Sequence, residues 1–262
     1  MSQYQEKATV SRVEQLSAKN YRLTLDSPDI SGAAKAGQFV MIRTGLAKDP
    51  LLRRPFSIHQ TSANGQFQIY FKVVGRGTDM LARVKAGEIM SVFGPLGRGF
   101  RIKKNSPAII IGGGLGIAPM LFLAKSICRL KTDCSNDHII LGGRERSEVE
   151  PLVNDFRQFG LRLGLATDDG SYGHQGYVTD LLKSLDLHPG YTVYACGPEP
   201  MMARVYSICK SGSMQCQVSV ESVMACGMGA CLGCSRMTKK GTYTHVCLNG
   251  PVFNAEELIW NS

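Results

Sequence analysis

Four cysteines late in the chain have the spacing of a metal-cluster ligand set. Cys226, Cys231 and Cys234 follow the pattern C-x4-C-x2-C, and Cys247 follows after twelve intervening residues. Thiolates at this spacing hold the irons of plant-type [2Fe–2S] centres. Five residues between or just before the first three thiols are glycine or alanine, which lets backbone approach a buried cluster closely; they are Ala225, Gly227, Gly229, Ala230 and Gly233. The pattern therefore predicts a protein that moves single electrons.

Three other interpretations of the cysteines are weaker. Structural zinc sites pair two close cysteines with two more close ones, whereas here three are close and one is distant. A disulfide framework is not needed by a chain of 262 residues. His245 precedes Cys247 by two residues, but a Rieske centre needs two histidines, so we interpret His245 as a solvated or outer residue. The other thiols indicate a reducing cytoplasm; they are Cys128, Cys134, Cys196, Cys209 and Cys216.

Two glycine-containing segments could bind a dinucleotide. The segment 112–119 follows a strand-like run and opens a helix, and its glycines let backbone amides reach a pyrophosphate. Pro119 stands where a Rossmann fingerprint has its third glycine. The segment Cys196-Gly-Pro ends a later strand-like run, where ligands bind in doubly wound sheets. The thiol of Cys196 could touch a nicotinamide ring, although a buried cysteine there could also serve packing alone.

Two further segments in the first hundred residues could hold anions. In Leu52-Arg-Arg-Pro-Phe-Ser-Ile58 an arginine could bind phosphate, and Ser57 could meet a flavin ring. The segment 74–78 offers backbone amides at the start of a helix. Taken alone, each segment could equally be a solvated surface.

Residues 1–100 are expected to form a small β-barrel. Six short alternating runs lie between turn signals, and Asn64-Gly65 predicts a hairpin. The runs cover 8–13, 21–25, 38–43, 56–59, 66–74 and 88–93. One helix is predicted over 78–84, with Thr78 as its cap.

After Pro107 strand-like and helical runs alternate, which predicts a parallel, doubly wound α/β domain. The expected strands are 108–111, 138–141, 161–166, 191–195 and 215–220, with helices such as 119–130 and 199–210. We therefore expect three domains: a β-barrel over 1–100, an α/β domain over 101–220 and a small cysteine-loop domain over 221–262.

Composition narrows the classes of protein to which the chain could belong. The chain carries 30 Lys+Arg against 21 Asp+Glu, a net charge of +9, yet it has no dense basic run of the kind that marks nucleic-acid binding. Anionic cofactors are the simpler explanation for that charge. The uncharged run 108–124 contains four glycines and a proline, so it predicts a strand, turn and helix rather than a membrane span. The polar first residues lack a signal-peptide core.

Together the motifs resemble the ferredoxin–NADP reductase-like superfamily. The likeness is closer to the electron-transfer subunits of class 1B dihydroorotate dehydrogenases, and it runs nearly the whole chain. Its most specific parts are the segments 52–58, 221–234 and 247–253. The departures are modest: Leu232 and Gly233 stand where relatives often carry an aromatic residue or alanine.

This resemblance implies cofactors and site residues. It implies that FAD is held by Arg53, Arg54, Pro55, Phe56, Ser57, Tyr70, Phe71, Lys72, Gly77 and Thr78. It implies an iron–sulfur centre on Cys226, Cys231, Cys234 and Cys247. For NAD we expect contacts from Gly112, Gly113, Gly114, Gly116, Cys196, Gly197 and Pro198. Ser57 and Cys196 are the residues expected to tune the chemistry.

The resemblance also implies a partner subunit and a direction of electron flow. An FMN-containing catalytic subunit would oxidise dihydroorotate, and its electrons would pass through the cluster and FAD to NAD+ in pyrimidine (UMP) synthesis. The expected assembly is a heterotetramer of two copies of each chain, in the cytoplasm, without nucleic acid or membrane.

Two other functions remain open from the sequence. Subunits of NADH-dependent ferredoxin:NADP reductases or sulfide dehydrogenases resemble the chain, but those relatives carry an aspartate cluster ligand and a hydrophobic residue in place of Arg54. A zinc-bearing module that binds nucleic acid is the third interpretation. The choice between NAD and NADP rests on the segment 142–147, where Glu145 could bind a ribose hydroxyl and Arg144 or Arg146 a 2′-phosphate. The resemblance favours NAD.

Overall fold

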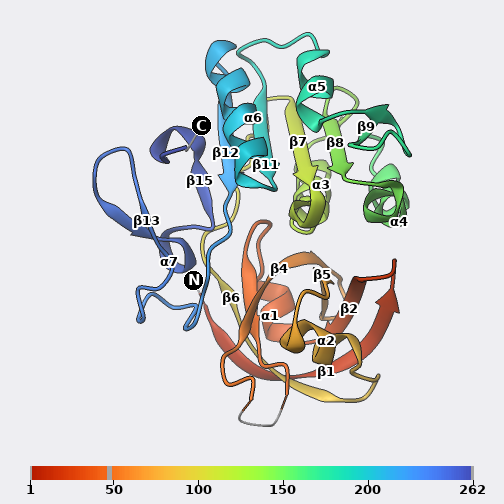
Figure 1. Cartoon of the computed structure of the whole chain (residues 1–262), viewed down its shortest axis with the longest axis vertical. Helices are drawn as coiled ribbons and strands as arrows, with labels where there is room; N and C mark the ends of the chain where they lie inside the picture. The colour runs from red at the N-terminus through yellow and green to blue at the C-terminus, as the bar shows by residue number, and fades with distance from the viewer. Residues whose placement is uncertain (1, 46–48, 261–262) are drawn as a thin grey trace.

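The chain forms a barrel domain, a sheet domain and a C-terminal segment that lies beside both (Figure 1). The computed structural model describes residues 2–45 and 49–260. Residues 1 and 262, the outer limits of the first and last predicted domains, lie outside the described residues.

The barrel is closed, with strand order β1-β2-β5-β4-β3-β6. Its strands are β1 (Tyr4–Gln15), β2 (Asn20–Asp26), β3 (Phe39–Ile42), β4 (Arg54–Thr61), β5 (Gln66–Lys72) and β6 (Ile89–Leu96). Alternate side chains such as Leu23, Ile58 and Ile69 fill the interior and are fully buried. The small barrel predicted from six alternating runs is confirmed.

Two short helices accompany the barrel, α1 (Pro28–Ala33) and α2 (Arg76–Ala82). The placement of Thr78 as the cap of the second was wrong, because the helix begins two residues earlier and Gly75 is its N-cap. Thr78 sits inside the first turn, where its Oγ1 accepts the N–H groups of Val74 at 2.9 Å and Gly75 at 3.1 Å. A side chain at this third helical position reaches back to the N-cap amide, as the second residue of a capping box does.

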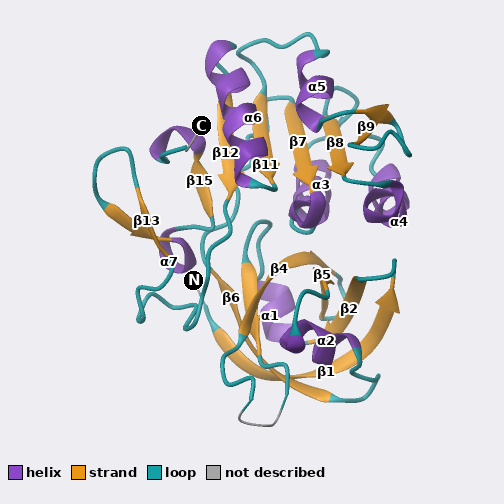
Figure 2. Ribbon diagram, viewed as in Figure 1, coloured by secondary structure: helices purple, strands orange, loops and turns teal. Residues whose placement is uncertain are grey.

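The sheet domain has strand order β10-β9-β8-β7-β11-β12-β15. Its first six strands in chain order run parallel: β7 (Ala108–Gly113), β8 (His138–Gly143), β9 (Arg162–Thr167), β10 (His174–Gln175), β11 (Thr192–Cys196) and β12 (Gln215–Ser219). The connecting elements are η1 (Gly114–Ile117), α3 (Met120–Leu130), α4 (Arg146–Arg157), α5 (Val178–Lys183) and α6 (Glu199–Ser211), which flank the sheet (Figure 2). The doubly wound α/β prediction is confirmed.

The C-terminal segment is tied to the sheet domain by a strand. After the cysteine loop come a hairpin of β13 (Ser235–Met237) and β14 (Tyr243–His245), then α7 (Val246–Asn249), β15 (Val252–Asn254) and η2 (Ala255–Glu257). β15 pairs antiparallel with β12 and so becomes the outer strand of the sheet. The exact domain limits proposed from the sequence stay a prediction.

The cysteine loop also rests on the barrel. A side chain added at Gly227 would meet Met41 of β3 at 2.6 Å and Leu96 of β6 at 3.1 Å. Gly227 has φ +75°, a conformation that favours glycine. The loop therefore depends on glycine both for its backbone turn and for its close contact with the barrel.

Across 2–45 and 49–260, none of the helices combines the length and the apolar character that spanning a membrane requires.

Candidate functional site

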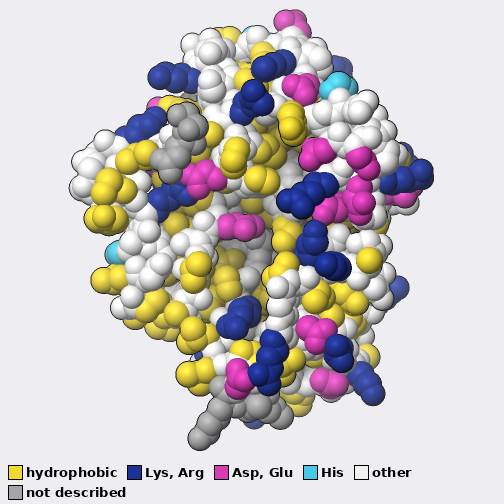
Figure 3. Space-filling model, in the orientation of Figure 1, with side chains coloured by type: hydrophobic (Ala, Val, Ile, Leu, Met, Phe, Trp, Pro, Cys, Tyr) yellow, Lys and Arg dark blue, Asp and Glu magenta, His cyan; other side chains and the backbone are white. Residues whose placement is uncertain are grey.

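A cavity of about 730 Å³ lies between the barrel and the sheet domain. The carboxyl ends of β7, β8, β9 and β11 form one wall, and β2 and β5 of the barrel contribute to the other. Figure 3 shows the face of the molecule hollowed between the two domains, with Lys and Arg side chains gathered to one side. Ligands of doubly wound sheets bind at this edge.

Both predicted nucleotide-binding segments line this cavity. Gly113, Gly114 and Gly116 come from the first segment, and Gly197 and Pro198 from the second. A side chain at Gly116 would collide with the backbone carbonyl of Cys196, and one at Gly113 would collide with the Met201 sulfur. Glycine is thus required where the η1 turn packs against the end of β11.

Two predicted residues of these segments lie below the cavity surface. Gly112 is the fifth residue of β7, and a side chain there would lie 3.0 Å from the Ile117 backbone. Cys196 ends β11, is 3% exposed and is not among the residues that line the cavity. Burial raises the pKa of its thiol well above the ordinary value, and the nearby Glu221 carboxylate adds to the rise. Its contact with a nicotinamide ring stays a prediction.

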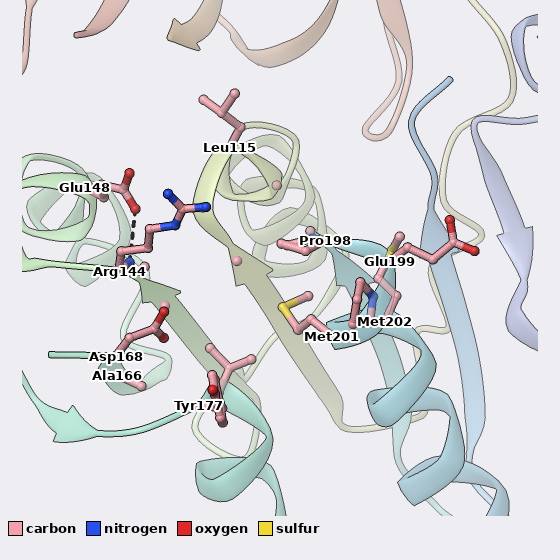
Figure 4. A pocket seen from close by; sticks show the side chains of 18 of the residues that line it. Leu115, Arg144, Glu148, Ala166, Asp168, Tyr177, Pro198, Glu199, Met201 and Met202 are labelled. Atoms are coloured by element: carbon pink, nitrogen blue, oxygen red, sulfur yellow. Dashed lines mark hydrogen bonds between the residues drawn. The ribbon is translucent and has the colours of Figure 1, made fainter. Parts of the chain in front are cut away.

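The barrel contributes Tyr70 and Lys72 to the same cavity. Lys72 Nζ donates to Glu148 Oε1 at 2.8 Å, which joins β5 to the first turn of α4. Glu148 Oε2 accepts the Arg144 backbone N–H at 3.0 Å (Figure 4). Burial opposes ionisation of Glu148, but these partners prevail and lower its pKa. Lys72 therefore holds the two domains together across the cavity.

Sequence reasoning missed several lining residues. Asp168 and Tyr177 follow β9 and β10, and the rule that ligands meet strand ends could have found Asp168. Of the three residues weighed for NAD or NADP binding, only Arg144 lines the cavity. Arg146 instead pairs with Glu150 in its own helix.

Two buried polar atoms in the cavity wall fit a polar ligand. Asn20 Oδ1 and Thr179 Oγ1 have no hydrogen-bond partner among the described residues. Asn20 is 4% exposed and Thr179 is 1% exposed, and both line the cavity. Buried polar groups without partners are rare, so their presence fits a bound dinucleotide that supplies the missing hydrogen bonds.

A second candidate site, a cradle on the barrel, fits a diphosphate. A side chain at Gly77 would lie 3.3 Å from Arg54 Nε and 3.5 Å from Thr44 Oγ1, so glycine gives the guanidinium access to the start of α2. Thr44 Oγ1 is buried and has no hydrogen-bond partner in the described part of the chain. A fixed guanidinium beside an unpaired hydroxyl is the donor set that the diphosphate of FAD requires.

The other predicted flavin residues surround this cradle on β4, β5 and α2. Phe56 packs edge-on against Phe71, with ring centroids 5.7 Å apart. Ser57 lies opposite Phe39 in the β3–β4 ladder. Arg53 donates to Ser91 Oγ at 3.0 Å and does not share the Gly77 contact of Arg54. Pro55 and Thr78 complete the set, and the contact of each with FAD stays a prediction.

The four predicted ligand thiols lie in one loop and its neighbouring helix. Cys234 and Cys247 have sulfurs 3.2 Å apart, and both residues are buried. Cys226 Sγ accepts the N–H groups of Met228 and Cys231 at 3.4 Å, and Cys247 Sγ accepts that of Gly229 at 3.1 Å. Such N–H···S bonds stabilise thiolates, the form that binds iron.

The Cys226 thiol shows this effect in its pKa. Partial burial opposes ionisation, but the backbone N–H groups of Cys231 and Met228 outweigh it and lower the pKa to about 6. Within 2–45 and 49–260 no three His, Cys, Asp or Glu side chains surround a point as a single-ion site would. A two-iron cluster is wider than one ion, and the donor set fits it.

The cysteine segment exposes several large hydrophobic side chains. Seven of them between 221 and 260 are at least 39% exposed: Val223, Met228, Leu232, Met237, Tyr243, Leu248 and Ile259. Leu232 also has φ +59°, a strained conformation for a leucine. We name this group of seven residues the apolar rim.

Three family models match successive parts of the chain. An oxidoreductase FAD-binding domain matches residues 5–100, and an oxidoreductase NAD-binding domain matches residues 110–207. The iron–sulfur cluster binding domain of dihydroorotate dehydrogenase B matches residues 221–259.

Curated relatives match over most of their length. The dihydroorotate dehydrogenase B (NAD(+)) electron transfer subunit of Desulforamulus reducens is 36% identical over 97% of each chain. That of Clostridium acetobutylicum is 38% identical over 87% of each chain. Among solved structures, that of an NADH-dependent reduced ferredoxin-NADP oxidoreductase superposes with a TM-score of 0.83 and 28% identity, covering 97% of this chain and 90% of the other.

Proposed function

The chain belongs to the family of electron transfer subunits of dihydroorotate dehydrogenase B, and from this we infer how its own residues divide the work of an electron relay. We propose that electrons enter from the FMN of a catalytic subunit, pass through a [2Fe–2S] cluster and FAD, and leave on NAD+ in UMP synthesis. The observation that carries the proposal is the placement of the thiol loop directly on the barrel strands β3 and β6.

Each group of residues has a task in this relay. Arg54 and Thr44 bind the FAD diphosphate beside Gly77, while Tyr70 and Lys72 form the barrel wall of the cavity. Asn20 and Thr179 bind polar groups of the dinucleotide in that cavity. When bound, the flavin exchanges a hydride with NAD and single electrons with the cluster. Glu148 holds Lys72 across the cavity and so keeps the barrel wall and the sheet-domain wall of the cavity in one arrangement.

The partner binds the apolar rim. Exposed hydrophobic side chains gathered around a cofactor mark a protein contact, and the core of such an interface excludes water. The assembly is a heterotetramer of two chains of each kind. Its place is the cytoplasm, in keeping with cysteines that form no disulfide among the described residues.

Co-expression with the FMN-containing catalytic subunit tests this function. The pair should elute together in size-exclusion chromatography and reduce NAD+ when dihydroorotate is supplied. Separate elution, together with electron exchange between this chain, ferredoxin and NADP, would replace the proposal with the ferredoxin:NADP reductase alternative.

Cys231→Ser tests the order of the relay. Cys231 is exposed and is the predicted ligand least involved in packing, so its loss should remove the cluster and leave the barrel folded. Dihydroorotate-dependent NAD+ reduction should fall to background, whereas NADH oxidation by an artificial dye should persist with a full complement of FAD. Cys128→Ser, outside the loop, is the matched control. Loss of flavin together with the cluster would contradict the proposed separation of the two sites.

A further inference from the structure

An ion pair joins the cysteine segment to the sheet domain beside the cavity. Arg236 of β13 donates from Nη2 to Glu199 Oε1 at 2.7 Å and from Nη1 to Glu199 Oε2 at 3.4 Å. Such two-point contacts between guanidinium and carboxylate fix orientation as well as distance. Their side chains are 18% and 41% exposed, so solvent screens the pair only in part.

Both residues of this pair line the nucleotide cavity, and Arg236 also lies close to the thiol loop. Glu199 is the first residue of α6 and directly follows Pro198 in the cavity wall. Arg236 lies two residues after Cys234, at the start of the hairpin that leads back to Cys247. The pair therefore spans from the nucleotide cavity to the thiol loop.

Arg236 is itself held in place by the tail of the chain. Its Nη2 also donates to the Ile259 carbonyl at 3.2 Å, and its guanidinium carbon lies 5.6 Å from the centre of the Trp260 ring. Trp260 Nε1 in turn donates to the Ala255 carbonyl at 2.8 Å. An arginine with partners on three sides is pre-organised, and the ammonium of a lysine offers neither the planar fork nor the face that stacks on an aromatic ring.

We infer that Arg236 is a positioning residue for electron transfer between flavin and cluster. By fastening the β13–β14 hairpin to α6, it fixes the distance between the ligand thiols and the flavin site. The rate of electron transfer between two centres falls steeply with their separation, so a hairpin that moves away slows the transfer. This inference rests on the relay proposed above.

The step affected has a simple balance. With the cofactors bound, NADH would supply a hydride to FAD; the reduced flavin would then pass one of the two electrons to the oxidised cluster, release one proton to solvent and keep the second electron until the cluster is reoxidised. Arg236 takes no part in the bond changes and acts only through the position of the thiol loop.

Rapid mixing with NADH separates this step from hydride transfer. Flavin absorbance follows hydride transfer, and the electron paramagnetic resonance signal of the reduced cluster follows the second step. In Arg236→Met the ratio of the second rate to the first should fall, because the hairpin is no longer fastened to α6. Arg236→Lys should recover part of it. Lys240→Met, a cation of the same hairpin, is the control and should keep the wild-type ratio.

Glu199→Ala removes the same pair from the sheet domain and leaves the cysteine segment untouched. The ratio of the second rate to the first should fall in this variant too. The inference is therefore tested even if Arg236→Met fails to bind its cluster. A wild-type ratio in Glu199→Ala, or in a fully loaded Arg236→Met, overturns the inference. Failure of the wild-type chain to reduce its cluster with NADH would instead overturn the proposed relay.

Discussion

At the scale of single residues, Arg54 carries the clearest expectation. Its guanidinium lies beside Gly77 and the unpaired Thr44 hydroxyl, where the diphosphate of FAD fits. A charge-assisted hydrogen bond contributes about 1.5–3 kcal/mol, so Arg54→Ala should weaken FAD binding roughly ten- to a hundredfold. Equilibrium dialysis measures the change. Arg12→Ala, an exposed arginine on β1, is the control, and equal flavin retention in both variants would show that Arg54 is only a surface charge.

His59 makes stability depend on pH. The ring is fully buried, its Nδ1 lies 2.7 Å from the Ala118 carbonyl, and Nε2 has no partner among the described residues. Desolvation lowers its pKa from 6.5 to about 4, with a smaller contribution from Arg22, although the Ala118 bond opposes the shift. The ring thus stays neutral in the folded chain where the unfolded chain takes up a proton.

The sign of this effect follows from the two pKa values. Above pH 6.5 the ring is neutral in both states, and as the pH falls from 6.5 towards 4 only the unfolded chain gains the proton. The free energy of unfolding should therefore fall by about 2 kcal/mol between pH 7 and pH 5 on account of His59. Urea unfolding measures this free energy at each pH. For His59→Gln it should fall by about 2 kcal/mol less than for the wild type between pH 7 and pH 5. An equal fall for variant and wild type would mean that the ring is protonated in the folded chain.

At the scale of elements, the η1 turn depends on a close backbone contact. A side chain at Gly116 would collide with the Cys196 carbonyl, which has no room to withdraw because it belongs to β11, an interior strand paired on both sides. Gly116→Ala should therefore shift η1 and raise the KM for NADH about tenfold, by analogy with the 1–3 kcal/mol that overpacking costs.

Gly114→Ala is the matched control for that turn. A side chain at Gly114 meets nothing within 4 Å, and only its φ of +55° disfavours alanine. Steady-state kinetics with NADH and a dye should show a small effect for Gly114→Ala and a large one for Gly116→Ala. The reverse order would refute the proposed contact between η1 and β11.

The sequence allowed elements to be predicted where a local pattern determines them. The alternating runs of the barrel and the apolar run of β7 give their strands directly. α1 has six residues and no apolar period, so it carries no such signal. β15 and Arg236 were missed for a different reason: their roles depend on contacts with β12 and Glu199, which are distant in sequence. The site was predicted best where glycine or cysteine spacing reports a constraint, and least where two domains meet.

At the scale of the whole molecule, the apolar rim should decide assembly. Met228 is 50% exposed in the middle of the cysteine loop. Met228→Glu would bury an unpaired charge in the proposed interface and should abolish co-elution with the catalytic subunit, while both cofactors stay bound. Size-exclusion chromatography with flavin and iron analysis measures both. Ile89→Glu alters an apolar residue on the barrel that is 61% exposed, and it should leave the complex intact. Co-elution of the Met228→Glu pair would place the interface elsewhere.

The antiparallel pairing of β15 with β12 also bears on how the protein is made. All six barrel strands have been translated once residue 96 is added, so a nascent chain can close the barrel and accept flavin early. β12 keeps an open edge, prone to wrong pairing, until residue 254 has left the ribosome. Cys247 emerges only shortly before. The same late segment that completes the predicted cluster site therefore also closes the sheet.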